Sequence, residues 1–459
     1  MARKKTYNKT EMTFQIPKYI IFIIIIVIYV IIHYLTNKYY QVPEQSDEPY
    51  HLNQTLIYVN NYYQNYLSTV TTFPLSFIIT SLYLKFKNHG YGFLLNEITN
   101  KINRNDYLIF LSDGRVISIL MSLITLFIIS LMDNNNNNLM LITFFTFPLK
   151  FLYSFLIYTE NFSILLMTLY YYFENCKKTN NKYLLFLIGL LSILSRQLNI
   201  IWINMFPLMY FIQIFFYKKI NINILFDSIK EIIIKYFHVF IIDISFIVFF
   251  IVNNFSFVLG DKGSHKAKIH LTQINHFLFY LLWHFPFLNF KLYDMYKKSN
   301  IKNKKKWLKN SFILFLFLQF FHLFMITRRN IFIHTKHYNR YYYLGIYYKF
   351  INRNCLLIYF SLLYGAYITD YIKIFKKPKF ISWLICNILS FSIEGLVEPR
   401  YFINGIYILI FLINNEDNKE REELSYYLFN NKINISFHII QDIYMIYNLI
   451  AEKDNAYVY

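Results

Sequence analysis

The 459-residue chain has few charged residues for its length, since Asp, Glu, Lys and Arg together make up only 16% of it. An ordinary soluble domain carries about 25%. Hydrophobic residues reach 56% and aromatic residues 21%, more apolar surface than so few charges could cover in water. The composition therefore excludes an ordinary soluble protein and predicts that lipid is the solvent for much of the chain.

Cysteines and flexible linkers are also scarce. The three cysteines (Cys176, Cys355 and Cys386) provide neither a disulfide framework nor a Cys-x-x-Cys metal spacing. No Gly/Ser-rich linker separates domains in the sequence, and no Gly-rich phosphate-binding loop or nucleotide-sugar domain is recognisable. The simplest organisation is one membrane domain with inserted loops.

The net charge is +20, but the basic residues occur in short clusters between apolar runs, such as residues 2–5, 302–306 and 373–379. Clusters of this kind are typical of cytoplasmic loops that set membrane topology and contact anionic lipid. The distribution argues against nucleic acid as a partner and predicts contact with membrane lipid.

The first apolar run, residues 19–34, follows several basic residues and has no small-residue cleavage site. We expect a signal anchor with its N-terminus in the cytosol, so that residues of about 36–105 form the first lumenal region. Later apolar runs, among them 107–131, 139–158 and 231–259, predict 10 to 13 spans in an all-α polytopic membrane domain. This domain covers residues 1–414, and residues 415–459 are expected to form a peripheral tail.

Polar residues beside apolar spans are costly unless they have a function. Asp47, Glu48 and His51 follow the first span directly. Two adjacent carboxylates at the lumenal membrane surface could supply a general base to a lipid-borne substrate. Thr72 belongs to a second polar group that precedes a turn at Pro74.

Three further groups are rich in hydrogen-bond donors and positive charge. They are Arg196, Gln197 and Asn199; Asp261, Lys262 and His265; and Asn339 and Arg340, taken with Glu398 and Arg400. Their arginines suit a phosphate or a carboxylate, and the glycines around Asp261 give the backbone freedom to approach an anionic head group. A His/His/Asp metal site near His265 is conceivable, but its spacing matches no strong motif.

Taken in order, these groups resemble the Die2-type family of dolichyl-phosphate-glucose α-1,2-glucosyltransferases, over about residues 15–414. The resemblance rests on Asp47-Glu48-Pro49-Tyr50-His51, Thr71-Thr72-Phe73-Pro74, Arg196-Gln197-Leu198-Asn199-Ile200-Ile201-Trp202, Gly260-Asp261-Lys262-Gly263-Ser264-His265, Asn339-Arg340-Tyr341-Tyr342 and Glu398-Pro399-Arg400-Tyr401-Phe402. The third and fourth pieces are the most specific. One departure is Tyr158-Thr159-Glu160, where the family favours an Asp and this chain keeps the charge.

The resemblance implies a GT-C membrane architecture whose active site faces the lumen, in a multi-pass protein of the endoplasmic reticulum membrane. It implies dolichyl-phosphate glucose as the donor and the diglucosylated dolichyl-diphosphate oligosaccharide as the acceptor. The product would carry the terminal α-1,2-linked glucose used in protein N-glycosylation. No cofactor and no obligatory metal are expected.

Transfer from a β-linked donor to an α-linked product inverts the anomeric carbon, so one base is needed and no protein nucleophile. Asp47 is the expected base, with Glu48 positioning the acceptor or sharing the proton, and which of the two acts stays open. Arg400, Arg340 and His265 are the first candidates to bind the donor phosphate, and Arg196 and Lys262 are the second. The other expected substrate-binding residues are His51, Thr72, Gln197, Asn199, Asp261, Asn339 and Glu398. The number of spans before Arg196 could place it on the cytosolic side.

Two alternatives remain at this stage. One is another dolichyl-phosphate-sugar-dependent enzyme, a mannosyltransferase, which would share the carboxylates of the first lumenal region. The other is a non-enzymatic membrane protein such as a channel regulator. Ion pathways place their carboxylates at mid-membrane, whereas Asp47 and Glu48 are expected in a lumenal loop, which favours an enzyme.

Overall fold

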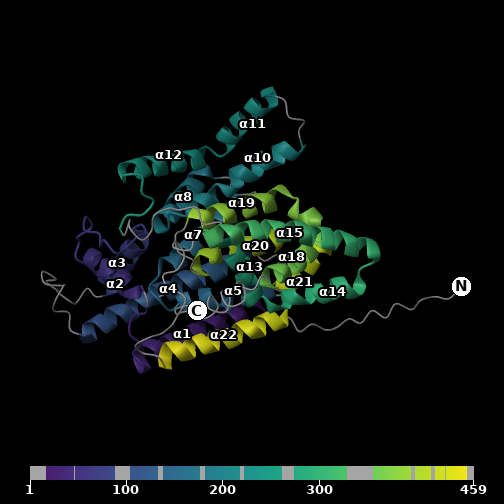
Figure 1. Cartoon of the computed structure of the whole chain (residues 1–459). Helices are drawn as coiled ribbons and strands as arrows, with labels where there is room; N and C mark the ends of the chain where they lie inside the picture. Colours follow the sequence, from purple (N-terminus) through teal and green to yellow (C-terminus); the bar gives the residue numbers. More distant parts are fainter. Residues whose placement is uncertain are drawn as a thin grey trace.

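The computed structural model describes residues 17–45, 47–87, 104–132, 138–175, 181–217, 222–260, 273–327, 355–393, 399–414, 419–428 and 431–451. Within these ranges every regular element is helical and no strand occurs. This confirms the all-α class predicted from the sequence. Figure 1 shows the helices gathered in one body, with α2 and α3 at one end and α14 at the other.

The N-terminal third builds the end of the body that carries the first carboxylates. Its elements are α1 (Lys18–Tyr34), the π-helical η1 (Leu35–Tyr39), α2 (Glu48–Val59), α3 (Leu75–Lys87) and α4 (Arg104–Met132). Pro49 lies in the first turn of α2, where the missing N–H costs no helical hydrogen bond. α2 and α3 pack together, and α4 packs against both α3 and α1.

The middle of the chain contains helices shorter than the spans expected from the sequence. They are α5 (Leu139–Phe145), α6 (Pro148–Tyr153), α7 (Thr159–Asn175), α8 (Lys182–Ser195), α9 (Asn199–Ile203) and α10 (Met205–Tyr217). The apolar run 139–158 is divided because Phe147 is extended and Pro148 cannot continue a preceding helix. The run 231–259 is also divided: α11 (Ile222–Lys235) and α12 (Phe237–Val252) meet at an angle of 85° and form the upper arm of Figure 1.

The C-terminal half completes the body. Its elements are α13 (Gln273–His284), η2 (Pro286–Asn289), α14 (Phe290–Lys298), α15 (Ile301–Thr327), α18 (Cys355–Phe375), α19 (Pro378–Ile393), η3 (Pro399–Phe402), α20 (Ile403–Asn414), α21 (Lys419–Leu428) and α22 (Lys432–Ala451). Every residue of α20 except Asn404 is buried. This helix therefore forms the centre of the apolar core.

The segment that was expected to form a peripheral tail packs on the body. Asn434 of α22 accepts a hydrogen bond from the backbone N–H of Phe287 at 3.0 Å, and the His438 ring donates to the His284 carbonyl. Both side chains are fully buried. α22 lies along the lower face of the body in Figure 1 and packs against α6 and η2.

Three helical stretches among the described residues are long and apolar enough to cross a membrane: Lys18–Tyr39, Asp106–Met132 and Asn199–Phe216. The bent pair α11 and α12 makes a fourth if it counts as one span, and three shorter apolar helices accompany them. These helices agree with a polytopic membrane protein. The count of 10 to 13 spans stays a prediction.

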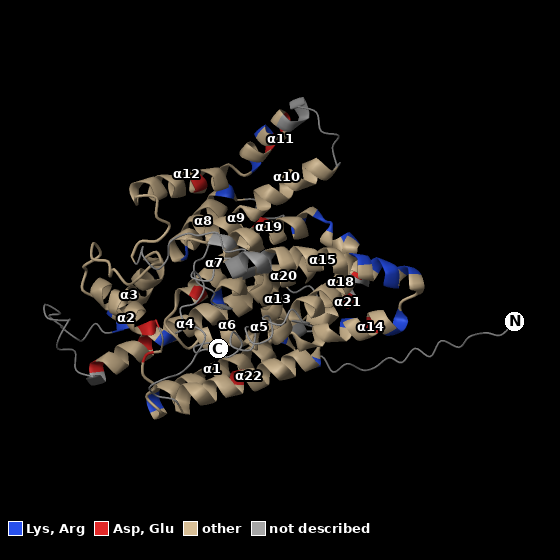
Figure 2. Cartoon of the chain, viewed as in Figure 1, with Lys and Arg blue, Asp and Glu red and all other residues tan. Residues whose placement is uncertain are grey.

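The charges of the described residues are distributed unevenly along the body. Figure 2 shows lysines concentrated on α14 and the start of α15, at the end opposite α2 and α3. Lys306 donates to the carbonyl oxygen of Thr369 at 3.3 Å, so the basic clusters 302–306 and 373–379 lie near each other. Which side of the membrane each end of the body faces stays a prediction from the basic clusters.

Candidate active site

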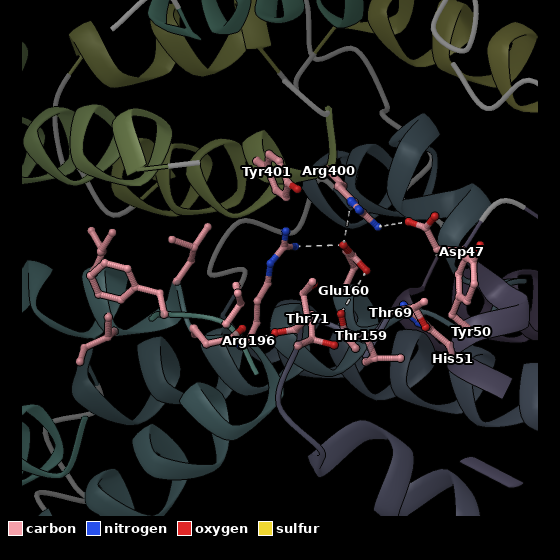
Figure 3. A pocket seen from close by; sticks show the side chains of 18 of the residues that line it. Asp47, Tyr50, His51, Thr69, Thr71, Thr159, Glu160, Arg196, Arg400 and Tyr401 are labelled. Carbon is pink, nitrogen blue, oxygen red and sulfur yellow. Dashed lines mark hydrogen bonds and ion pairs between the residues drawn. The ribbon is translucent and has the colours of Figure 1, made fainter. Parts of the chain in front are cut away.

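A polar cavity of about 200 Å³ lies where α2, the turn 69–72, the start of α7, the break between α8 and α9, and η3 meet (Figure 3). The ionisable side chains that line it are Asp47, His51, Glu160, Arg196 and Arg400, together with Tyr50 and Tyr401. The cavity therefore joins residues from distant parts of the chain.

The charged groups of the cavity form an alternating series. Asp47 Oδ2 lies 3.2 Å from Arg400 Nη1, and Arg400 Nε lies 3.5 Å from Glu160 Oε1. Arg196 Nη1 lies 3.1 Å from the same Glu160 oxygen. One carboxylate thus holds two guanidinium groups side by side, and the second carboxylate stands at the end of the series (Figure 3).

Local backbone structure places each member of this series. Arg196 has extended dihedral angles (φ −156°, ψ 124°), so that α8 ends there before α9 begins at Asn199. Glu160 lies in the first turn of α7, where a carboxylate is favoured by the helix dipole. Arg400 belongs to the short turn η3, which leads into the buried α20.

Aromatic rings surround the two arginines. The guanidinium carbon of Arg196 lies 4.9 Å from the centre of the Tyr401 ring, and that of Arg400 lies 5.6 Å from the same ring. The centre of the Tyr158 ring lies 5.8 Å from the guanidinium carbon of Arg400, and the Tyr158 hydroxyl accepts a hydrogen bond from the backbone N–H of Asp47 at 3.0 Å. The rings hold the guanidinium planes by cation–π attraction.

Glu48 does not line the cavity, although it follows Asp47 directly. Its side chain is fully buried and accepts hydrogen bonds from the backbone N–H groups of Gln45 and Ile157. Its two carboxylate oxygens also bind Arg115, at 2.9 Å to Nε and 2.6 Å to Nη2. The structure therefore gives Glu48 the surroundings of an anchor for the segment that carries Asp47.

Arg115 completes this anchor with its remaining donors. Nη1 donates to Asn37 Oδ1 and to the Val42 carbonyl, and Nη2 donates to the Pro43 carbonyl, at 2.9–3.0 Å. All five N–H groups of the guanidinium are thus used. α4 is tied in this way to the segment between η1 and α2.

His51 lies one helical turn after Asp47 and is 8% exposed. Its ring packs against Phe77 at 5.4 Å and against Tyr158 at 5.0 Å. α2 lies outside the candidate membrane spans. Burial lowers the pKa of His51 below its usual 6.5, and this outweighs the opposing attraction of Asp47 and Glu160. The imidazole is therefore neutral near pH 7.

The structure separates the remaining expected site residues into three groups. Thr72, Gln197 and Arg196 line the cavity, and Gln197 Nε2 donates to the Thr71 carbonyl at 2.7 Å. Asn199 is fully buried away from the cavity, where it donates to Ser163 Oγ at 2.8 Å. Asp261, Lys262, His265, Asn339, Arg340 and Glu398 lie outside the described residues.

Arg196 lines the same cavity as Asp47, although the number of spans before it could have placed it on the cytosolic side. Within the described ranges, no three His, Cys, Asp or Glu side chains are arranged to hold a metal ion.

Sequence reasoning missed Glu160, Arg115, Tyr158 and Tyr401 as site residues. Glu160 and Arg115 each carry a charge within or at the edge of an apolar run, which is a recognisable signal for function or pairing. The two tyrosines belong to pieces of the family resemblance, but tyrosine occurs 44 times in this chain, so residue type did not mark them as site residues. Their position in the fold beside the arginines does.

The chain is similar to three curated proteins that share the name Dol-P-Glc:Glc(2)Man(9)GlcNAc(2)-PP-Dol alpha-1,2-glucosyltransferase. It is 29% identical over 288 residues to the protein from Candida albicans, a match that covers 59% of this chain and 61% of the relative. The Kluyveromyces lactis protein is 23% identical over 415 residues (78% of this chain, 71% of the relative), and the Homo sapiens protein is 28% identical over 162 residues (34% and 32%).

The chain thus matches less than two thirds of the length of the Candida albicans relative. No solved structure shows a significant match. The profile of the DIE2/ALG10 family matches residues 42–411, which include every described residue of the cavity. The chain therefore belongs to the DIE2/ALG10 family.

Proposed function

We propose that this protein transfers glucose from dolichyl-phosphate glucose to the diglucosylated dolichyl-diphosphate oligosaccharide, and so adds the terminal α-1,2-linked glucose. The observation that carries the proposal is a cavity in which Asp47 pairs with Arg400 and Glu160 joins Arg400 to Arg196, in a chain of the DIE2/ALG10 family. The names of the three relatives supply the sugar and its lipid carriers. The same proposal places the protein in the endoplasmic reticulum membrane with the cavity facing the lumen.

In this proposal Asp47 is the general base. Its carboxylate takes the proton of the acceptor 2-hydroxyl while that oxygen attacks the anomeric carbon of the donor. The bond from that carbon to the phosphate oxygen breaks, and its electron pair leaves with dolichyl phosphate. One displacement inverts the anomeric carbon through a transition state that resembles an oxocarbenium ion, and no covalent enzyme intermediate forms.

Arg400 and Arg196 stabilise the leaving phosphate. A phosphodiester leaves as an anion, so it needs positive charge more than it needs a proton, and paired guanidinium groups suit phosphate oxygens. Glu160 keeps the two arginines together before the donor arrives. Lys262, His265 and Arg340, which lie outside the described residues, remain expected contributors at the phosphate.

Glu48 has a positioning role in this mechanism. Its oxygens are occupied by Arg115 and by two backbone N–H groups, and it does not line the cavity, whereas Asp47 does. The arrangement favours Asp47 in the choice that the sequence alone left open.

The two alternative functions are not favoured. The relatives are named for a glucose donor and not for a mannose donor. A channel regulator would not need a base beside paired arginines. Purified protein that transferred mannose from dolichyl-phosphate mannose, and no glucose, would overturn the proposal.

The test in cells is the size profile of lipid-linked oligosaccharides after removal of the protein. The two-glucose form should accumulate, wild type should restore the three-glucose form, and Asp47→Asn should fail to restore it. Asp294→Asn is a matched control, because Asp294 pairs with Lys298 on α14 at the opposite end of the body. A normal profile without the protein and without a redundant enzyme would contradict the proposed function.

A further inference from the structure

Two buried polar atoms in the described part of the cavity wall lack a hydrogen-bond partner. They are Nδ1 of His51 and Oγ1 of Thr72. The great majority of buried polar side-chain atoms in folded proteins have a partner. Two such atoms, from separate elements that line one small cavity, therefore indicate that polar groups of a bound ligand supply the missing hydrogen bonds.

Both atoms belong to the side of the cavity that α2 and the turn before α3 provide. His51 follows Asp47 by one helical turn, and its ring packs on Phe77 of α3. Arg196 and Arg400 enter from the break after α8 and from η3. In an in-line displacement the attacking hydroxyl and the leaving phosphate lie on opposite sides of the anomeric carbon. If the arginines bind the phosphate, the α2 side faces the acceptor.

The state of the His51 ring selects the kind of ligand. Nδ1 of the ring is unpartnered, and with the proton of the neutral imidazole on Nε2 it is a hydrogen-bond acceptor. The charged groups that influence the ring are Asp47, Glu160 and Arg400, and burial dominates all three and keeps the ring neutral. A neutral acceptor and a threonine hydroxyl on one cavity suit sugar hydroxyls, and neither gives charge to a phosphate.

We propose that His51 and Thr72 bind hydroxyl groups of the terminal glucose of the acceptor, with His51 Nδ1 accepting a hydrogen bond from one of them. This inference rests on the proposed function. The sequence predicted only that His51 and Thr72 contact substrate. On this inference they recognise the acceptor sugar and direct its 2-hydroxyl to Asp47.

The test combines enzyme variants with altered acceptors. The purified full chain in lipid nanodiscs is given dolichyl-phosphate glucose and lipid-linked acceptors whose terminal glucose lacks the 3-, 4- or 6-hydroxyl. His51→Phe keeps a flat ring without an acceptor atom, and His51→Asn places an amide oxygen near the position of Nδ1. Thr72→Val and Thr72→Ser remove and keep the hydroxyl in the same way.

Wild type should lose about 10- to 100-fold in kcat/KM with one deoxy acceptor, the range expected for one hydrogen bond in a buried site. His51→Phe should lose a similar factor with the complete acceptor and nothing further with that deoxy acceptor, whereas His51→Asn should recover much of the loss. Thr72→Val should show the same dependence for a neighbouring hydroxyl. A merely structural role would lower activity with all acceptors alike.

The matched controls are His238→Phe and Thr80→Val, because both residues are buried and neither lines the cavity. They should keep the wild-type preference among the acceptors. If His51→Phe also keeps that preference for every deoxy acceptor, the inference is overturned while the proposed function stands. Wild type that transfers no glucose to the complete acceptor overturns the proposed function and the inference with it.

Discussion

Replacing Arg115 with methionine should destabilise the protein more than most single substitutions. The side chain is 1% exposed, and its five donors bind Glu48, Asn37 and the carbonyls of Val42 and Pro43. The substitution leaves the Glu48 carboxylate buried without its cation, which costs about 3–5 kcal/mol. Lysine should not rescue the protein, because an ammonium group has three donors and cannot reproduce the planar fork.

A double-mutant cycle isolates the pair. Unfolding free energies can be measured by SDS titration in mixed micelles for Arg115→Met, Glu48→Met and the double variant. The double variant should be less destabilised than the sum of the single variants by about 2 kcal/mol or more, since it buries no lone charge. It should remain less stable than wild type, because the N–H groups of Gln45 and Ile157 lose their acceptor.

Lys298→Met provides the comparison for this cycle. Lys298 pairs with Asp294 one turn earlier on α14, and the two side chains are 72% and 28% exposed, so neither charge is left buried when the other is removed. We expect it to change the unfolding free energy far less than Arg115→Met does. An effect of Arg115→Met as small as that of Lys298→Met, or single effects that add within about 0.5 kcal/mol, would refute the anchor described here.

Three further results are expected. Glu160→Gln removes the carboxylate between Arg196 and Arg400 and leaves Arg400 only Asp47 as an ion-pair partner, so stability in the same titration should fall by about 3 kcal/mol or more. Glu160→Asp should recover part of this loss, and equal losses in both variants would contradict the charge argument. Because burial holds the pKa of His51 below 6.5, the unfolded chain takes up this proton first as the pH falls, and thermal stability should decline below about pH 6.5. The decline in thermal stability should be smaller in His51→Asn. If stability falls equally steeply with pH in both proteins, His51 is not the group responsible. A Cβ at Gly260 would lie 1.8 Å from the Val70 carbonyl oxygen, so Gly260→Ala should displace the turn 69–72 and lower glucose transfer; unchanged transfer would show that the turn tolerates this shift.

The fold class could be predicted from the sequence because it depends on composition over long stretches. Low charge and repeated apolar runs are sufficient for an all-α membrane protein, and Pro148 marks a break that local chemistry explains. The 85° bend at Tyr236 could not be predicted, since the bend contains neither proline nor glycine. The packing of α12 against α8 accompanies this bend, and no local signal encodes that contact.

The candidate site was predictable by residue type but not by arrangement. Asp47 and Glu48 are adjacent carboxylates, yet neighbouring residues at a helix start point in directions about 100° apart, so one faces the cavity and the other the interior. Arg196 and Arg400 were recognisable as costly arginines at membrane boundaries. Their shared contact with Glu160 could not be predicted, because nothing in the spacing of the sequence relates α7, α8 and η3.

The packing of α22 has a consequence for biosynthesis. The ribosome synthesises α22 after every helix that α22 packs against. The His284 carbonyl and the Phe287 N–H therefore lack their partners His438 and Asn434 until α22 emerges. A premature stop codon that removed only α22 would leave the residues of the cavity intact but expose polar backbone groups on the face that α22 covers. Such a truncated chain would carry a complete set of described site residues and still present the signal by which membrane quality control selects proteins for degradation.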